Sequence, residues 1–385
     1  MSMMKKILFV VPSLEVGGTI SSLLSIVEYL RDKYIVNIFV LAHEGNKNLP
    51  FNDLILNKHF AVHAYNSTLA KSTGFERILI AFIKVIKRIC LIFNCDLEMC
   101  LYKSVVSRMQ NLEYDYVVGY QEGAATKFAS LFKNNTRFAW VHCDYSKYPM
   151  AGKEINLYKE FNRIICVSAY TANNFRLIYP ALSDNVEAIH NILNINFIRD
   201  KANEQIRDSY FDISYFTIIS VGRINPVKRF NLIPLIAKRL KDNGCDFRWY
   251  ILGPNYNDNC YRNLINLINS YEVSENVIYL GNKENPFPYY VKSNLLISLS
   301  STEACPMIFN EAKVISLPVL TANFGSSYEF IEDGINGRIV AIDDMFDTLY
   351  ELISNKESYV SLKNNTLHCS YNNSMIYDSL DNLFA

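Results

Sequence analysis

The stretch Ser300-Ser-Thr-Glu-Ala-Cys-Pro-Met-Ile-Phe-Asn-Glu-Ala312 carries two glutamates eight positions apart, Glu303 and Glu311. The run before it, Leu295 to Leu299, is short and apolar and predicts a buried strand. Pro306 suits the first turn of a helix, where its missing N–H costs nothing. The stretch therefore predicts a strand, a loop with Glu303 and a helix with Glu311. Both carboxylates can then lie at the electropositive start of the helix, which favours anions.

A solvated helix face explains two glutamates at this spacing equally well. The wider pattern is more informative, because apolar strand-like runs alternate with helix-like ones along the whole chain. Such alternation predicts an α/β protein with parallel sheets covered by helices on both faces. The predicted strands are 7–11, 35–41, 116–120, 138–141, 164–167, 216–221, 249–252, 277–280, 295–299 and 319–321.

The length of 385 residues favours two domains, each able to bury its own core. The segment 191–214 is polar and poor in pattern, which predicts a linker between them, and residues 375–384 predict a terminal helix. Half of the residues are hydrophobic, as in a globular protein. Nine cysteines without metal-site spacing indicate reduced thiols, and we expect a cytoplasmic protein without a secretory signal or a bilayer-spanning segment.

The formal net charge is zero, yet the two halves differ. Through His190 there are 21 basic and 16 acidic residues, which leaves 17 and 22 of the 38 of each kind for the remainder. A basic first half suggests an anionic partner, although chance explains the asymmetry as well. Nothing in the sequence indicates a nucleic-acid partner.

The predicted strand 216–221 is followed by Gly222, Arg223 and Lys228. Glycine permits close backbone approach, and two cations then stand at the carboxyl end of a parallel strand, where such folds bind ligands. A pyrophosphate needs this charge; surface basic residues are the alternative. Gly17 and Gly18 follow the first strand and precede a helix, so their N–H groups can approach a phosphate or an acceptor. A plain strand-to-helix turn is the alternative there.

Trp140-Val-His-Cys-Asp-Tyr145 also follows a strand, which predicts that His142 and Asp144 lie in the same crevice between the two domains. A lone histidine is more often a structural residue. Ser168 and Asn191 follow strand-like runs too, with a weaker signal.

Two further stretches, Ile315-Ser-Leu-Pro-Val-Leu-Thr321 and Glu329-Phe-Ile-Glu-Asp-Gly-Ile-Asn-Gly-Arg338, complete an ordered series after the two glutamates. The series resembles the donor-binding half of retaining group 1 glycosyltransferases of the GT-B fold, of the bacterial polysaccharide, O-antigen and capsule type. In that family a Gly and a Phe follow the first glutamate, where this chain has Ala304 and Cys305. The family also usually has Gly after its lysine, where this chain has Arg229.

The resemblance implies two Rossmann-like domains that face each other across a cleft. Residues 1–193 would bind the acceptor, residues 194–370 the nucleotide-sugar donor, and 371–385 would form a helix that returns to the first domain. It further implies that Glu311 binds the ribose and Glu303 the sugar hydroxyls or the developing positive centre. The residues that it assigns to catalysis are Glu303, His142 and Glu311; to the donor Arg223, Lys228, Glu303, Glu311, Gly222, Gly17, Gly18, Met307, Ile308, Gly325 and Ser326; and to the acceptor Asp144 and Tyr145.

The expected activity is retaining transfer of a hexose or N-acetylhexosamine from a nucleotide sugar, most often UDP-linked in similar proteins, to a saccharide acceptor in surface polysaccharide biosynthesis. The chain contains no Asp-x-Asp pair, so we expect no metal and no cofactor beyond the substrate. The alternatives are a non-catalytic sugar-nucleotide-binding or scaffold protein of the same fold and a nicotinamide-dependent oxidoreductase. The latter lacks its glycine fingerprint.

The segment Arg77 to Phe93 reads as a basic amphipathic helix, with Arg77, Lys84, Lys87 and Arg88 near one side. Such a helix can lie in a membrane interface, with cations near anionic headgroups. A domain helix with a broad buried face is an equal alternative. A membrane contact would favour a lipid-linked acceptor and a place at the cytoplasmic face of the inner membrane.

Overall fold

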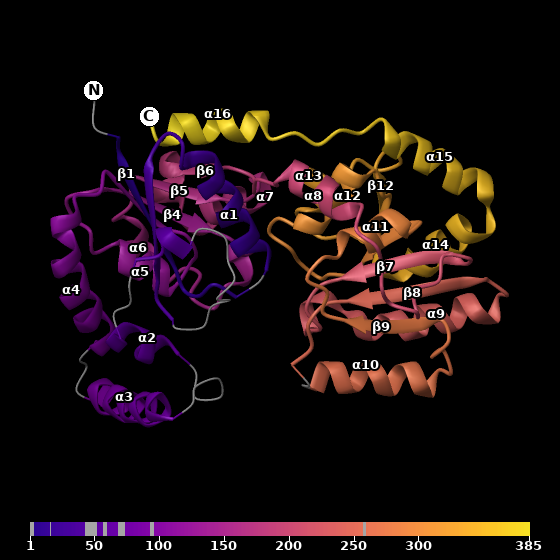
Figure 1. The fold of residues 1–385 in the computed structure, drawn as a ribbon, viewed down its shortest axis with the longest axis horizontal. Helices are drawn as coiled ribbons and strands as arrows, with labels where there is room; N and C mark the ends of the chain where they lie inside the picture. The colour runs from indigo at the N-terminus through magenta and orange to yellow at the C-terminus, as the bar shows by residue number, and fades with distance from the viewer. Residues whose placement is uncertain are drawn as a thin grey trace. The chain divides into compact units, whose positions relative to one another are not determined.

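The computed structural model describes residues 4–15, 17–42, 52–56, 60–67, 74–92, 96–256 and 259–385. The chain forms two compact units, each built on its own six-stranded sheet (Figure 1). Unit 1 comprises Met1–Ile192 and Ile376–Ala385, and unit 2 comprises Leu193–Met375. The predicted α/β class with two Rossmann-like sheets is confirmed.

The sheet of unit 1 is parallel throughout, in the order β2-β1-β3-β4-β5-β6. Its strands are nearly continuous apolar runs, because helices cover both faces of a parallel sheet. The order changes direction between β1 and β3, so the loops after these two strands diverge at that point. The strands are β1 (Lys6–Val11), β2 (Ile35–Val40), β3 (Tyr116–Gly119), β4 (Thr136–Val141), β5 (Arg163–Cys166) and β6 (Val186–Ala188).

The helices of unit 1 are α1 (Gly18–Leu30), α2 (Phe60–Asn66), α3 (Phe75–Ile92), α4 (Leu97–Met109), α5 (Ala124–Ala129), α6 (Ile155–Tyr158), α7 (Ala169–Ile178) and α16 (Ser374–Leu383). Among the described residues, no helix is both long enough and apolar enough to span a bilayer. The last residue of the predicted helix Arg77 to Phe93 lies outside the described residues.

The C-terminal helix α16 belongs to unit 1 although it follows the whole of unit 2 in the chain (Figure 1). Phe384 is fully buried among aromatic rings of the first sheet, including Phe9 and Tyr116. The Tyr116 hydroxyl donates to the Phe384 carbonyl over 2.9 Å. The burial of this large aromatic side chain helps to hold the terminal helix in place.

The sheet of unit 2 is also parallel, in the order β12-β11-β10-β7-β8-β9. This is the doubly wound order of a dinucleotide-binding fold, and the direction of winding reverses between β7 and β10. Ligands in such sheets bind outside the carboxyl ends of the strands at this reversal. The strands are β7 (Phe216–Val221), β8 (Phe247–Leu252), β9 (Val277–Gly281), β10 (Leu295–Ser298), β11 (Val319–Ala322) and β12 (Gly337–Val340).

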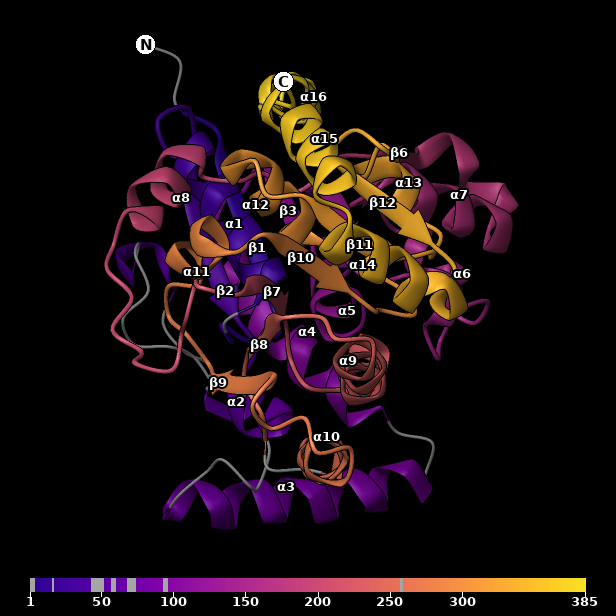
Figure 2. The ribbon, with the colours of Figure 1, turned by 90° about the vertical axis from the view of Figure 1, so that its right-hand side faces the viewer.

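Helices cover both faces of the second sheet (Figure 2). Because side chains alternate along a strand, Ile218 packs with α9, α10 and α14 in one core, and Ile219 packs with α8, α11 and α12 in the other. The helices of unit 2 are α8 (Ile195–Ala202), α9 (Ile233–Asp242), α10 (Asn259–Ser270), α11 (Phe287–Lys292), α12 (Met307–Ile315), α13 (Ser327–Phe330), α14 (Met345–Ser354) and α15 (Lys356–Leu367).

The prediction of a linker over 191–214 is wrong for α8, which is part of unit 2. The Asn194 side chain caps this helix by accepting from the Phe197 N–H over 2.9 Å. The Ile198 side chain is only 3 % exposed and packs among residues of α11 and α12. Ile195, Ile198 and Ala202 share one helix face, a short apolar stripe that polar neighbours obscure in the sequence.

Candidate active site

Two glycines end the neighbouring strands β7 and β8 of unit 2. Gly222 and Gly253 have φ angles of 149° and 144°, a region that side chains strongly disfavour. A Cβ atom on Gly253 would lie 1.9 Å from the Gly222 carbonyl oxygen, and a Cβ on Gly222 would lie 3.0 Å from the Lys228 Cε. The two strand ends therefore approach as closely as backbone allows, and the Lys228 side chain lies over Gly222.

Lys228 forms an ion pair with Glu303, which brings the loop after β7 to the loop after β10. The lysine ends a short 3-10 turn, Pro226–Lys228, that Asn225 caps by accepting from the Lys228 N–H over 3.0 Å. The Ser300 hydroxyl donates to Glu303 Oε1 over 2.7 Å. Both charged side chains are mostly buried, with 19 % and 18 % of their surface exposed. The pair thus stands at the reversal of the sheet, where an anionic ligand is expected.

The two arginines near Lys228 differ in their setting. Arg223 is exposed, and no hydrogen bond or ion pair joins it to another described residue, so its guanidinium is available to a phosphate. Arg229 adopts a left-handed conformation with φ of 51°. Glycine adopts this conformation at no steric cost, whereas a side chain makes it unfavourable.

Glu311 lies on α12 and is the second glutamate of the predicted pair. The Tyr290 hydroxyl donates to Glu311 Oε2 over 3.1 Å. Burial raises the pKa of the Glu311 carboxyl to about 7, although the Tyr290 hydrogen bond and the charge of Lys228 both lower it. Lys228 therefore acts on both glutamates: it binds Glu303 directly and influences the pKa of Glu311 through its charge.

Glu311→Gln is expected to change how the stability of the protein depends on pH. The folded-state pKa near 7 exceeds the ordinary value of 4.5, so the folded protein holds a proton that the unfolded chain releases. The wild type should therefore lose stability relative to the variant as the pH rises from 4.5 to 7, by about 3 kcal/mol, with no further change above that. Urea unfolding at stepped pH values measures this difference.

The exposed Glu275 provides the matched control, because Glu275→Gln on the same unit should follow the wild type across this range. If the stabilities of the wild type and Glu311→Gln changed with pH in the same way, the pKa of the Glu311 carboxyl would be ordinary and the prediction wrong.

The N-terminus of α12 lies in the same place. The helix begins at Met307 after Pro306, and within the described residues no side chain caps it and no acid occupies its first turn. The Met307 side chain is buried in the core, so Met307 can reach a donor only through its backbone N–H, whereas the Ile308 side chain is partly exposed. An uncapped helix start of this kind suits a phosphate.

Ser326 is buried and its hydroxyl donates to the Glu303 carbonyl over 2.7 Å. Its side chain thus holds the loop after β10 against the loop after β11, and the contact of its backbone N–H with a phosphate stays a prediction. Gly325 beside it is exposed and offers backbone to a ligand. The structure therefore unites Gly222, Lys228, Glu303, Ser326 and the start of α12 at one edge of the second sheet.

His142 follows β4 at the carboxyl edge of the first sheet. Burial lowers the pKa of His142 to about 3, so the imidazole is neutral at physiological pH. Its ring lies 4.6 Å from the ring of Tyr120, and its backbone N–H donates to Glu122 Oε2 over 2.9 Å. The Nε2 atom is buried and makes no hydrogen bond with any described residue. This nitrogen has no surface open to a ligand in the structure, so the sugar contact of His142 stays a prediction.

Glu122 is a candidate that the sequence reasoning missed. It ends the turn after β3, and burial raises the pKa of its carboxyl. The contact with the His142 N–H crosses twenty positions of sequence, so no local motif reveals it. Its carboxylate holds the backbone of His142 directly after the end of β4.

The predictions of acceptor contacts for Asp144 and Tyr145 need correction. Tyr145 is fully buried, surrounded by the rings of Tyr158 and Phe175, and its hydroxyl donates to Glu154 Oε2 over 3.1 Å. Asp144 is 5 % exposed and caps the following turn by accepting from the Ser146 N–H over 3.2 Å. Both side chains serve the fold of unit 1, because the chain turns inward directly after His142.

Gly17 and Gly18 start α1 after the first strand, as the sequence predicts. Both are exposed, and a Cβ on Gly17 would meet no atom within 4 Å. The loop therefore leaves open space beside the helix start. No side chain caps this end of α1 in the described chain, so its N–H groups remain available to a ligand.

A buried hydrogen-bond network underlies this edge of unit 1. The Ser22 hydroxyl lies 2.9 Å from the Tyr120 hydroxyl and donates to Asn191 Oδ1 over 2.8 Å. These hydrogen bonds connect α1, the residue that follows β3 and the last residues of unit 1 before unit 2. Ser168 instead caps α7 by accepting from the Thr171 N–H, a structural role.

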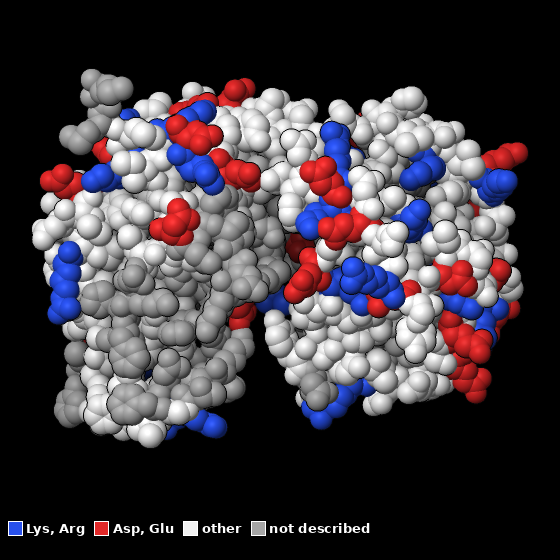
Figure 3. Space-filling model, viewed as in Figure 1, with Lys and Arg blue, Asp and Glu red and all other residues white. Residues whose placement is uncertain are grey.

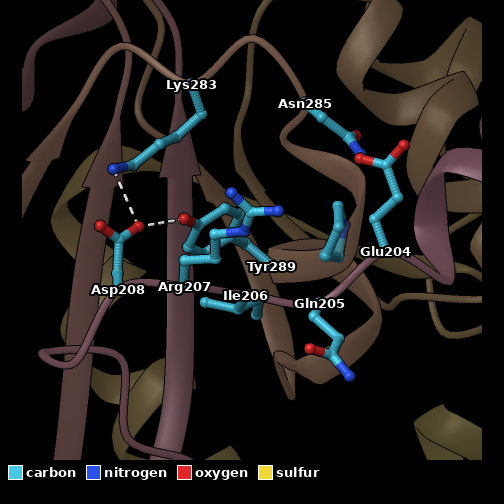
Figure 4. A pocket seen from close by; sticks show the side chains of 9 residues that line it. Glu204, Gln205, Ile206, Arg207, Asp208, Lys283, Asn285 and Tyr289 are labelled. Atoms are coloured by element: carbon cyan, nitrogen blue, oxygen red, sulfur yellow. Dashed lines mark hydrogen bonds and ion pairs between the residues drawn. The ribbon is translucent and has the colours of Figure 1, made fainter.

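A separate cavity of about 540 Å³ lies on unit 2 beside α11 (Figure 4). Asp208 accepts hydrogen bonds from Lys283 and Tyr289 at one side of it. On the other side Asn285 donates to Glu204 over 2.7 Å. None of the predicted site residues lines this cavity, and its two acids, Glu204 and Asp208, already have hydrogen-bond partners. It carries no part of the candidate site.

Charges of both signs are interspersed on the face of unit 2 shown in Figure 3. Among the described residues, no three His, Cys, Asp or Glu side chains gather as metal ligands. The expectation that the reaction needs no metal stays a prediction.

Residues 202–368 match the family model described as "Glycosyl transferases group 1". An uncharacterised glycosyltransferase of Methanocaldococcus jannaschii is 27 % identical over 203 residues, which cover 51 % of this chain and 48 % of that protein. A 41.2 kDa protein in the cps region of Klebsiella pneumoniae is 27 % identical over 176 residues, 45 % of this chain and 43 % of that one. The matches thus span less than half the length of these relatives.

The solved structure of Alr3699/HepE from Anabaena, in complex with UDP, is similar over 98 % of this chain and 99 % of its own, with a TM-score of 0.70 and 15 % identity. The same protein has also been solved with UDP and glucose and with UDP-glucose. At this level of identity the likeness concerns the fold. The chain therefore has the GT-B fold, and its residues 202–368 match the group 1 glycosyltransferase family.

Proposed function

We propose that the protein is a retaining glycosyltransferase that moves a hexose or N-acetylhexosamine from a UDP-linked donor to a saccharide acceptor. Unit 2 binds the donor and unit 1 binds the acceptor, which is a lipid-linked saccharide of surface polysaccharide biosynthesis. The absence of disulfides between the described cysteines fits a reducing cytoplasmic location.

The Lys228–Glu303 pair is the observation that carries this proposal. It places a cation and a carboxylate together at the reversal of a doubly wound sheet, with Glu311 within the electrostatic reach of the same lysine. A diphosphate needs the cation, and sugar and ribose hydroxyls need carboxylates that accept hydrogen bonds. A nucleotide sugar combines these three groups in one molecule.

The chemistry follows from these positions. Lys228, Arg223 and the start of α12 stabilise the charge on the diphosphate as the bond between the sugar carbon and the phosphate oxygen breaks. Glu303 accepts from sugar hydroxyls and stabilises the positive charge that develops on the ring. The acceptor oxygen forms the new bond on the face that the diphosphate leaves, and its proton passes to the departing phosphate oxygen.

Three observations support the finer parts of the proposal. HepE, which shares the fold, binds UDP and glucose, which favours a UDP-linked hexose. The Klebsiella relative is encoded in a cps region, which favours a polysaccharide product. The matched segment 202–368 includes Lys228 and both glutamates, so the family likeness covers the proposed donor site.

UDP is expected to stabilise the protein against thermal unfolding more than GDP or ADP do. A ligand at 100 times its dissociation constant stabilises the folded state by about 2.7 kcal/mol. Thermal unfolding with each nucleotide, and with its sugars, measures the preference. Transfer assays with the preferred sugar nucleotide then separate an enzyme from a non-catalytic binding protein of the same fold. No stabilisation by any nucleotide would contradict the proposed donor site.

A further inference from the structure

Helix α3 presents a row of large apolar side chains to solvent. Ile78, Phe82, Val85, Ile89 and Ile92 are 69 %, 60 %, 54 %, 48 % and 78 % exposed. Their spacing of four, three, four and three residues places them on one face of the helix. Single exposed apolar residues are common on protein surfaces, but a continuous row along a whole helix marks an interaction site.

The opposite face of α3 packs against its own unit. Ile80 is 2 % exposed, and the helix lies on α2 at the outer end of unit 1 (Figures 1 and 2). Lys87 reaches back over the Tyr65 ring of α2, with its Nζ 4.4 Å from the ring centre. One side of this helix therefore packs against unit 1, and the apolar row on the other side faces solvent. The prediction that four cations lie near one side of this helix is therefore wrong for Lys87, which faces α2.

A second row, of cations, runs beside the apolar one. Arg77, Lys84 and Arg88 are seven and four residues apart and share a side of the helix about 100° from the apolar row. Arg77 and Arg88 are exposed and Lys84 is partly so. Figure 3 shows uncharged surface and basic atoms at this end of unit 1. Long basic side chains at this angle can lay their stems on apolar groups and extend their charges to one side.

We propose that this face of α3, defined by the apolar row and the three cations, docks on the surface of an anionic lipid bilayer. The apolar row enters the boundary between headgroups and acyl chains, and the cations contact the anionic headgroups. The helix lies flat, because both rows run along its full length. The docking surface belongs to unit 1 and requires neither donor nor acceptor.

The arrangement of charge favours a bilayer over a second copy of the chain. Two antiparallel copies joined through this face would carry the same cations along one edge of the contact, and like charges across an interface oppose association. A bilayer with anionic lipids satisfies the cations and buries the apolar row at once. The same complementarity makes the proposed contact sensitive to salt.

Sedimentation of the full chain with vesicles tests this proposal without any sugar substrate. The wild type should bind phosphatidylcholine vesicles that contain phosphatidylglycerol and should bind pure phosphatidylcholine much less. Raising salt from about 0.1 M to about 1 M shortens the screening length from about 10 Å to about 3 Å and should release it. Arg77→Gln with Arg88→Gln should weaken binding about 30-fold, equivalent to about 2 kcal/mol. Phe82→Gln with Ile89→Gln should weaken it by a similar factor.

Matched variants on the rest of unit 1 control for general effects. Leu177→Gln removes an apolar side chain that is 79 % exposed on α7, and Lys153→Gln with Lys159→Gln removes two exposed cations. These variants should bind vesicles as the wild type does. Equal binding by the α3 variants, or equal binding to both vesicle types, would overturn the proposal. A dimer lost in Phe82→Gln with Ile89→Gln, without vesicle binding by the wild type, would assign the face to a second copy instead.

Discussion

Lys228→Ala is expected to reduce sugar transfer from the preferred nucleotide sugar by about 10- to 150-fold. The range corresponds to a charged hydrogen bond of about 1.5 to 3 kcal/mol to the diphosphate. The variant also removes the cation from Glu303, which keeps only the Ser300 hydroxyl among its described side-chain partners. Because the charge on the diphosphate grows as its bond to the sugar breaks, kcat should fall more than KM rises. Steady-state kinetics separates the two constants.

Lys238 offers a matched control on the same unit. It lies on α9 and forms an ion pair with Asp242, so Lys238→Ala also breaks a lysine–carboxylate contact. This pair is more exposed and lies away from the carboxyl edge of the sheet, and its loss should leave kcat and KM unchanged. Equal losses in the two variants would show that the effect of Lys228→Ala is one of stability and not of the site.

Gly253→Ala is expected to destabilise unit 2 by about 4 kcal/mol. Its φ of 144° is unfavourable for any side chain, and the added Cβ would lie 1.9 Å from the Gly222 carbonyl oxygen. Backbone strain and overpacking each cost about 1 to 3 kcal/mol. The clash is with backbone, so no side-chain rotation relieves it. Urea unfolding measures the loss, and a weaker response to nucleotide should accompany it because the strand end moves Gly222.

Gly244→Ala separates the two causes. Gly244 also has a positive φ, 75°, but a Cβ there would meet no atom within 4 Å. This variant should therefore lose only about 1 kcal/mol, the cost of the backbone conformation. Equal stabilities of the two variants would mean that the strand ends of β7 and β8 are not in close contact.

The alternation of apolar and polar runs is sufficient to predict the fold class. Strand β1 is apolar after its first residue, and β7 is mostly apolar with two buried hydroxyl residues, because both faces of a parallel sheet are buried. The short strands β6 and β12 carry less signal and were not predicted. Only the pairing of β6 with β5 and of β12 with β11 identifies them, and pairing partners are distant in the sequence.

The candidate donor site was predicted in its main members, because each follows a strand whose carboxyl end the pattern reveals. Lys228 and Glu303 meet in the structure although 75 positions separate them. The roles of Ser326 and Tyr290 were not predictable, since each depends on a contact with a glutamate on another element. Tyr145 is the opposite case. Its position after a strand predicts a place in the site, but its side chain is buried in the core.

The structure of the protein with bound UDP tests the central claim most directly. The diphosphate is expected within hydrogen-bond distance of Lys228 Nζ and of the first N–H groups of α12, with the ribose at Glu311. UDP bound in the cavity between Asp208 and Glu204, or away from the loops after β7 and β10, would contradict it.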